Sequence, residues 1–396
     1  MYVGNMDNCL FSPATFTGGV ECQYNSLHDV MTGYGRDLRQ DVKIASGFVQ
    51  NEWKLDYFTI LAGFRLDKHN LVDNVIFSPR INTLWKPSDK FQGRLTWSTG
   101  FRAPQAYDED LHVAAVGGEA MEVRLAEGLK PERSNSFSGS VDWSFNFGHF
   151  QSNLLLEGFY TALNDVFYLE SVGKDPVSGT LVQERRNGNG ARVYGANIDY
   201  KIAHGKEAQL QLGFTVQRSR YTEAVRWSED EDVAAIKRMP RTPDYYGYFT
   251  FSSAPLKNFD FSLSGVYYRT HDCSSLAGYI EKDCLEIPLT LWIQLEAELH
   301  LVLNDHLKLQ VNGGVQNIFN AFQKDLDKGM NRDSKYFYGP TQPRTYFIGI
   351  SSLINDNYLD GGVSWWRHRF FMCCSKCFHV RSVLPLQYCS TFLKVL

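Results

Sequence analysis

The chain of 396 residues lacks several features that would place it in a common class of protein. It has no run of about 18 to 20 consecutive apolar residues, which excludes a transmembrane helix. Its 40 basic and 44 acidic residues give a formal net charge of −4, so no cationic surface for a nucleic-acid backbone is indicated. The residues that follow Met1 include no basic segment before an apolar run, and no export signal is identified there.

Recognisable catalytic and metal-binding motifs are also absent from the sequence. It contains no Gly-x-Ser-x-Gly elbow, no His-Glu-x-x-His helix and no phosphate-binding loop. Cys374, Cys377 and His379 resemble half of a zinc site, but no second pair of ligands has the required spacing. The sequence therefore predicts no catalytic residue, no metal site and no cofactor, and we expect that the protein is not an enzyme.

The composition is rich in residues that favour β-structure. Aromatic residues make up 14% of the chain, with 21 Tyr and 27 Phe, and there are 32 Gly. Apolar and polar residues alternate along many segments, most clearly from Leu289 to Leu301, and also in Phe91–Ser98 and Gln209–Gln217. A helix would scatter these residues around its axis because its period is 3.6, so the pattern predicts long strands with one apolar and one polar face.

Such strands fit either a soluble sandwich with its apolar face inside or a membrane barrel with its apolar face outside. The lengths of the connections favour the barrel, because short turns near Lys54, Pro87, Gly148, His204 and Lys257 alternate with long polar segments. We expect about 14 strands, from near Phe16 to Ile350, in an all-β transmembrane antiparallel barrel. The long extracellular loops are then 102–131, 164–190, 218–242, 270–286 and 320–343, opposite short periplasmic turns.

Six short segments, in order along the chain, resemble motifs of TonB-dependent outer-membrane receptors. The most distinctive is Gly100-Phe101-Arg102-Ala103-Pro104, which follows an expected strand. The others are Phe77-Ser78-Pro79-Arg80, Leu129-Lys130-Pro131-Glu132-Arg133-Ser134, Val193-Tyr194-Gly195-Ala196, Gln316-Asn317-Ile318-Phe319-Asn320 and the closing segment 339–349. The segments are most similar in character to those of Bacteroidetes receptors for siderophores or cobalamin.

The resemblance implies active uptake of a scarce nutrient, such as an iron-siderophore, haem or cobalamin, across the outer membrane of a Gram-negative bacterium. The family's barrel has 22 strands and surrounds a plug domain that contacts the TonB complex. This chain would supply only the C-terminal part of that barrel, without the plug and the first strands. Its expected partners are outer-membrane lipid, the nutrient ligand, and TonB through the plug of a full-length parent.

The sequence after Leu353 departs from the family pattern. A closing strand of the family ends the chain, whereas here about 40 residues follow, and they include Trp365, Cys373 and Cys377 without strand alternation or turn chemistry. We therefore divide the chain into residues 1–353, the barrel portion, and residues 354–396, an atypical Cys-rich tail that a frameshift or a fusion would explain.

Candidate ligand contacts lie in the expected extracellular loops. Aromatic rings supply rigid binding area near a membrane rim, and one loop also gathers carboxylates and an imidazole, although a solvated acidic loop would have the same composition. The candidates are Tyr107, Asp108, Asp110, His112, Phe167, Tyr168, Tyr221, Tyr279, Tyr336 and Tyr338.

Two further groups of residues follow from the strand pattern. Gln294, Glu296, Glu298 and His300 are expected to face the lumen, where they either hydrate the interior or contact a substrate. Cys273 and Cys284 flank a loop segment in an oxidising compartment, so a disulfide between them is possible, although spacing alone does not establish the geometry.

Two alternatives to the receptor remain open at this point. The first is a passive porin-type channel without a plug, and the second is an outer-membrane barrel whose loops act directly, as an adhesin or an enzyme does. A plug and a TonB box encoded upstream in frame would favour the receptor.

Overall fold

The computed structural model describes 14 segments of the chain and no helix among them that is long and apolar enough to cross a membrane. The segments are residues 2–7, 13–32, 36–104, 121–176, 181–225, 235–239, 242–268, 272–274, 284–286, 290–303, 307–324, 340, 342–355 and 365–374.

The secondary structure of these segments is almost entirely β. The strands are β1 (Tyr2–Asp7), β2 (Ala14–Met31), β3 (Arg36–Lys54), β4 (Phe58–His69), β5 (Ile76–Ser88), β6 (Phe91–Arg102), β7 (Met121–Leu125), β8 (Glu132–Phe147), β9 (Phe150–Asn164), β10 (Phe167–Lys174) and β11 (Leu181–Asn187). They continue with β12 (Ala191–His204), β13 (Ala208–Val225), β14 (Ile236–Arg238), β15 (Tyr245–Leu256), β16 (Phe259–Tyr268), β17 (Asp272–Ser274), β18 (Cys284–Glu286), β19 (Thr290–Val302), β20 (Leu307–Gln316), β21 (Thr345–Asn355) and β22 (Trp365–Cys374).

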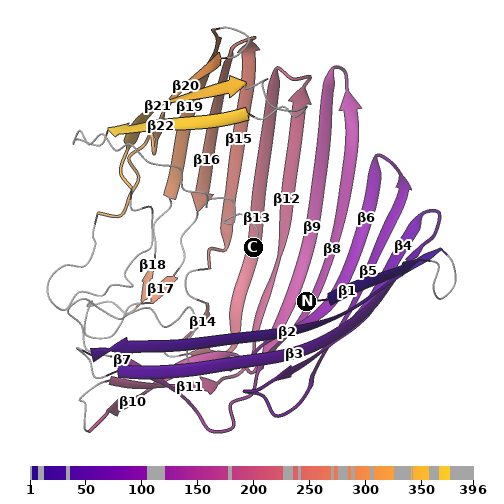
Figure 1. Ribbon diagram of the computed structural model, residues 1–396, viewed down its shortest axis with the longest axis vertical. Helices are drawn as coiled ribbons and strands as arrows, with labels where there is room; N and C mark the ends of the chain where they lie inside the picture. The colour runs from indigo at the N-terminus through magenta and orange to yellow at the C-terminus, as the bar shows by residue number, and fades with distance from the viewer. Residues whose placement is uncertain are drawn as a thin grey trace.

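Seventeen of these strands form one antiparallel sheet that follows the order of the chain. Each strand pairs with the next one that belongs to the sheet, from β1 with β2 to β21 with β22, and short β14 adds to β13. The sheet curves strongly, so that β2 and β3 run across the lower part of the view while β8, β9, β12 and β13 stand upright (Figure 1). Within the described residues, β1 pairs only with β2 and β22 only with β21.

The two rims of the sheet differ as the sequence predicts. One rim carries tight turns, such as Gly148-His149 between β8 and β9, where Gly148 has a φ of 60° that favours glycine. The other rim carries the long connections, and the short strands β7, β10, β11, β17 and β18 lie on that side (Figure 1). Fourteen strands of ten residues or more lie between β2 and β21, which confirms the expected number.

The apolar side chains cover one face of the sheet and remain exposed there. Ile198 pairs in register with Leu156 on one side and with Phe214 on the other, and all three side chains are more than 40% exposed. Few apolar side chains are fully buried among the described residues, and the largest cluster consists of Val72, Ile76 and Ala103. A soluble sandwich would bury this face, so the exposed apolar surface agrees with a barrel whose outside faces lipid.

Aromatic side chains form two rows on the apolar face. Near the loop rim, Trp97 lies 6.4 Å from Phe137 and Tyr160 lies 6.3 Å from Tyr194, measured between ring centroids. Near the turn rim, the row contains Phe58, Trp85, Phe91, Trp143, Phe147 and Phe150. Along β6, Phe91 and Trp97 are about 20 Å apart at roughly 3.3 Å per residue. Aromatic girdles on either side of an apolar band are typical of outer-membrane barrels.

The polar face is tied together by side-chain hydrogen bonds across the strands. Asn197 on β12 donates to Glu157 on β9 at 2.9 Å and accepts from Thr215 on β13 at 2.9 Å. Gln92 on β6 donates to Asp142 on β8 at 3.0 Å. These bonds connect neighbouring strands on the face opposite the aromatic rows, because adjacent residues of a strand point to opposite sides.

Two features differ from the expectations of the sequence. The long loops contain the short strands named above, and the segment after Leu353 contributes β22, whose backbone pairs with β21 from Tyr346 to Asn355. The free edge of β21 offers unpaired backbone groups, so a segment with Trp365, Phe370 and Phe371 pairs with it despite its lack of alternation. The division of the chain at Leu353 stays a prediction.

Candidate functional site

The loop rim carries a small second sheet built from two connections that are far apart in the sequence. The hairpin β10–β11 comes from the connection between β9 and β12, and β7 pairs with β11 in parallel from Met121 to Leu125. Arg124 forms an ion pair with Asp175 at 3.0 Å, which joins β7 to the end of the hairpin. We call β7, β10 and β11 the rim sheet.

Asn187 fastens the base of the rim sheet to the barrel strands. Its Nδ2 donates to the backbone oxygen of Lys130 at 2.9 Å and to that of Asp165 at 2.8 Å, and its Oδ1 accepts from the Lys130 amide at 2.7 Å. Asp165 has a φ of 55°, a left-handed conformation that Asp adopts more readily than most residues. One amide side chain therefore fixes where both loops leave the barrel.

Phe167, a predicted ligand contact, lies between two guanidinium groups of the loop rim. The Cζ atoms of Arg102 and Arg185 are 5.7 and 5.8 Å from its ring centroid, a distance at which cation–π attraction operates. Its backbone amide donates to Glu132, which also faces Arg102 at 3.6 Å. Arg185 is 1% exposed, so this cluster holds the rim sheet against the barrel. Whether Phe167 also contacts a ligand stays a prediction.

The exposed side of the hairpin carries a second group of charges. Arg186 on β11 is held by carboxylates of Glu184 and Glu170, the first at 2.5 Å. The hydrogen bond that Arg186 donates to Glu184 raises the pKa of Arg186 above its ordinary value. Tyr168, another predicted contact, is the register partner of Arg186 and is half-buried. This side of the hairpin therefore combines an aromatic ring with fixed charges of both signs.

Four arginines lie close together at the loop end of β12, β13 and β14. Asp244 faces Arg218, Arg220 and Arg238 at 3.1, 3.6 and 3.2 Å. Arg192 is the register partner of Arg220, which is in turn the register partner of Arg238. Arg218 also donates to the hydroxyl of Tyr245 at 3.0 Å, with its Cζ 5.2 Å from the ring centroid. We call Arg192, Arg218, Arg220 and Arg238 the arginine band.

The residues predicted to face the lumen lie on the polar face of β19. The four side chains are half-buried, while Leu291, Leu295 and Leu299 on the opposite face are exposed. His300 contacts Asp260 of β16 at 2.8 Å, and Glu296 accepts from Asn312 of β20 at 3.2 Å. Glu298 and Gln294 pair in register with Asp260 and Ser264. Like Asn197, they lie on the polar face of the sheet, and their role toward a substrate stays a prediction.

Two of the sequence motifs have a structural explanation at this rim. Asn317, with a φ of 53° and no exposed surface, donates to the backbone oxygens of Ala321 and Gln342 at 3.0 and 2.9 Å. It also accepts from the Ala321 amide at 2.8 Å. The motif from Gly100 to Pro104 contains Ala103, which packs in the small cluster with Val72 and Ile76. Both motifs therefore fix the point at which a loop leaves its strand.

Several predicted residues cannot be placed. Tyr107, Asp108, Asp110, His112, Tyr279, Tyr336 and Tyr338 lie outside the described residues. Tyr221 is described at the end of β13, where it pairs in register with Ala191. In the β17–β18 pair, Cys273 is the register partner of Leu285 and Cys284 that of Ser274, so the two cysteines are not opposite each other and the disulfide stays a prediction.

The sequence analysis did not identify the arginines, because it searched the loops for aromatic and acidic residues. A usable signal was nevertheless present. Arg218 and Arg220 continue the alternation of Leu212, Phe214 and Val216, and this spacing places them on the apolar face, just beyond its last apolar residue. In the described part of the chain, no group of three His, Cys, Asp or Glu residues is arranged to hold a metal ion.

The chain belongs to the TonB-dependent receptors, because residues 7–288 match the family described as "TonB dependent receptor-like, beta-barrel". It is 29% identical over 201 residues to the iron-regulated outer membrane virulence protein of Vibrio cholerae serotype O1, which covers 50% of this chain and 29% of that protein. These findings confirm the family, the barrel fold and the location in the outer membrane of Gram-negative bacteria.

Solved receptors share the fold at low sequence identity. The siderophore receptor PirA from Acinetobacter baumannii has a TM-score of 0.62 at 16% identity, over 88% of this chain and 53% of that chain. A variant of the ferric enterobactin receptor PfeA from Pseudomonas aeruginosa, in complex with enterobactin, has a TM-score of 0.65 at 14% identity, with the same coverage. The iron transporter FrpB from Neisseria meningitidis has a TM-score of 0.61 at 15% identity, over 88% of this chain and 54% of that chain. This chain thus spans about half the length of these receptors.

Proposed function

We propose that the protein takes part in active uptake of an iron-siderophore across the outer membrane, as the C-terminal barrel portion of a receptor. The observation that carries this proposal is the rim sheet, which joins two long loops and presents Arg186 and Tyr168 at the mouth of the barrel. Because Glu184 and Glu170 hold Arg186, this surface offers an aromatic ring beside charges of both signs, which suits a ligand that combines flat rings with charged groups. Haem and cobalamin are the alternative nutrients in this proposal.

The names of the relatives support iron as the nutrient. The curated relative is called iron-regulated, and two of the solved receptors are called siderophore or ferric enterobactin receptors. We transfer only this class of ligand, since the chain is less than 30% identical to each of them. We propose the aromatic candidates of the loops as contacts for the ligand. They are Tyr107, Phe167, Tyr168, Tyr221, Tyr279, Tyr336 and Tyr338.

We further propose that residues 1–353 form part of a wider barrel, with residues 354–396 as an added tail. β1 supports this view, because within the described residues it pairs only with β2, and each unpaired backbone group costs several kcal/mol in lipid. The partner strands and a plug that contacts TonB would belong to the parent protein. The polar face, with Glu296, Glu298 and His300, would then line the lumen. We propose no enzymatic activity.

A transport experiment separates this proposal from the alternatives. Cells that carry the full reading frame, or a deletion of it, would be starved of iron and supplied with radiolabelled ferric siderophores, haem or cobalamin. We expect saturable uptake of one ferric siderophore that stops when TonB is deleted or when a protonophore is added. Uptake that continues without TonB would identify a passive porin, and a chemically altered ligand would identify an enzyme.

A further inference from the structure

Asn187 makes contacts of the kind that a neighbouring strand makes. Its side chain engages both backbone groups of Lys130, since its Oδ1 accepts from the Lys130 amide at 2.7 Å and its Nδ2 donates to the Lys130 oxygen at 2.9 Å. The other hydrogen of Nδ2 is used as well, because this atom also donates to the backbone oxygen of Asp165 at 2.8 Å. Two bonds to one residue fix the direction of approach as well as the distance.

These three bonds, which we call the clasp, join three separate pieces of the chain. Asn187 is the last residue of β11, Lys130 lies just before β8, and Asp165 lies in the link between β9 and β10. The amide of Gly188 donates to the backbone oxygen of Val166 at 2.8 Å, which holds the two links of the hairpin together. The hairpin β10–β11 is therefore attached at its base to both connections that form the rim sheet.

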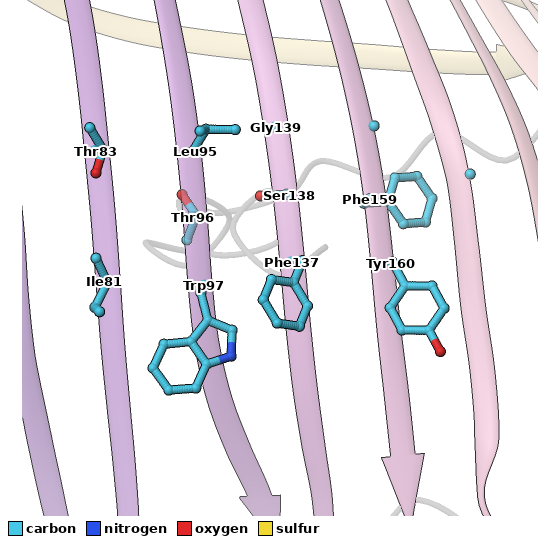
Figure 2. A pocket seen from close by; sticks show the side chains of 12 residues that line it. Ile81, Thr83, Leu95, Thr96, Trp97, Phe137, Ser138, Gly139, Phe159 and Tyr160 are labelled. Carbon is cyan, nitrogen blue, oxygen red and sulfur yellow. The ribbon is translucent and has the colours of Figure 1, made fainter.

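The barrel wall beneath the rim sheet supplies a regular base for this attachment. Figure 2 shows Trp97, Phe137 and Tyr160 side by side on the neighbouring strands β6, β8 and β9. The same strands keep one register up to the loop rim, where Arg102 pairs with Glu132. A hairpin that is fastened to this rim therefore has a defined orientation relative to the barrel.

The two sides of the hairpin have different neighbours. Phe167 and Asn187 form one register pair, and Tyr168 and Arg186 form the next. Because successive residues of a strand point to opposite sides, the first pair faces the barrel and the second faces away from it. The clasp on the inner side therefore determines where Tyr168 and Arg186 are held on the outer side.

The ring of Tyr168 lies against the backbone that follows Asn187. A Cβ atom added at Gly188 would be 3.0 Å from Cδ1 of Tyr168 and 3.5 Å from the backbone oxygen of Val166, so the absence of a side chain leaves room for the ring. Arg186 is held by the two carboxylates named above. Both outer side chains are therefore fixed by contacts within the hairpin, and the hairpin is fixed by the clasp.

We propose that Asn187 is a positioning residue, which holds the hairpin β10–β11 in the orientation in which Tyr168 and Arg186 bind a ferric siderophore, an inference that rests on the proposed function. A binding surface that is fixed in advance loses less conformational entropy when the ligand binds. A surface that adopts the competent orientation for only part of the time binds more weakly in proportion to that fraction. Loss of the clasp therefore lowers the affinity and leaves the later TonB-driven step unchanged.

The first test measures hydrogen exchange in the receptor encoded by the full reading frame, purified in mild detergent. We expect Asn187→Ala to speed exchange of the β10 and β11 amides about ten-fold, while β9 and β12 keep their wild-type rates. Asn187→Asp has the same shape but lacks both donors, so it should behave like Asn187→Ala. The control Asn153→Ala removes an amide that is bound to Asp142 and Ser144 on the polar face and should leave the hairpin unchanged. Wild-type exchange rates in both Asn187 variants would overturn the proposal.

The second test measures binding and uptake of radiolabelled ferric enterobactin, a chelate that combines aromatic rings with negative charge, by whole cells. We expect Asn187→Ala to raise the Kd about ten-fold, with the number of sites per cell and the uptake rate at saturating chelate unchanged. Gly188→Ala keeps the clasp but displaces the ring of Tyr168, so it should raise the Kd by a smaller factor. Asn153→Ala should bind as the wild type does.

The possible results distinguish the role of Asn187 from the proposed function. A wild-type Kd in Asn187→Ala, together with a loosened hairpin, would overturn the role of this residue in binding. Fewer sites per cell at an unchanged Kd would mean that Asn187 serves only folding, which would overturn it as well. Absence of saturable binding by wild-type cells would instead contradict the proposed function for this chelate.

Discussion

The two faces of the sheet are stabilised in different ways, although they are made by alternate residues of the same strands. On the polar face, side chains of neighbouring strands bond to one another, as Asn197 does with Glu157 and Thr215. On the apolar face, large side chains such as Leu95 remain 67% exposed, and no other part of the described chain covers them. Side chains of the chain itself supply the hydrogen bonds of the polar face, whereas lipid would cover the side chains of the apolar face.

The largest effect concerns the sheet as a whole. If both edges of the sheet need partner strands, this chain expressed alone will not form a heat-resistant barrel, since its edges would leave backbone groups unsatisfied in lipid. Electrophoresis of heated and unheated samples in detergent, combined with limited proteolysis, measures this. A compact, protease-resistant species of the isolated chain in a bilayer would show that the edges are satisfied within it.

The next largest effect is expected when an arginine is placed on the apolar face of the sheet and, for comparison, on its polar face. In the intact receptor, Leu95→Arg places a charge in the middle of the apolar band and should destabilise the barrel by about 2–4 kcal/mol. Ser138→Arg lies on the polar face of the adjacent strand and should change stability by less than about 1 kcal/mol. Denaturant unfolding in lipid vesicles measures the free energy of unfolding of both variants. Equal losses would mean that both faces meet the same environment.

A smaller effect is expected from the hydrogen bonds of the polar face. Asn197→Ala removes the contacts with Glu157 and Thr215 and should cost about 2 kcal/mol, whereas Thr215→Val removes one of them and should cost about 1 kcal/mol. The same unfolding experiment measures both variants. If neither variant is destabilised, water in the lumen replaces these bonds at no net cost.

The smallest effect is expected at Glu296. Glu296→Gln keeps an oxygen that accepts the hydrogen bond from Asn312, which is 3.2 Å away, so stability should change by less than about 0.5 kcal/mol. A loss above about 1 kcal/mol would mean that the negative charge, and not the hydrogen bond, matters at this position. Such a result would give this carboxylate a specific electrostatic role on the polar face.

The sequence predicts those parts of the fold that depend on local alternation. The run from Leu289 to Leu301 identifies strand β19 and its two faces, because the side-chain period of a strand is 2. The rim sheet escapes such reasoning, since β7 and β11 pair across more than fifty residues and neither has a strong pattern. The buried bonds of Asn317 could not be derived either, because they depend on where Gln342 returns to the turn.

The residues of the candidate site also fall into two groups, those that the sequence predicts and those that it does not. Glu296, Glu298 and His300 were assigned to the polar face by parity, and they lie there. The arginine band was missed because its charges come together only through the register of β12, β13 and β14, which no single strand contains. Strand pairing, and not residue type, brings these side chains to one place.

The unbroken meander of the main sheet has a consequence for how such barrels change in size. Among the described residues, every long strand pairs with the long strands directly before and after it in the sheet, and only β13 also pairs with the short strand β14, so the environment of each strand is set mainly by two neighbours. A hairpin can then be gained or lost at one edge while the register of the remaining strands is kept, as in repeat proteins. Evolution can therefore increase or decrease the circumference of the barrel in units of two strands, while the pairing of the existing strands stays the same.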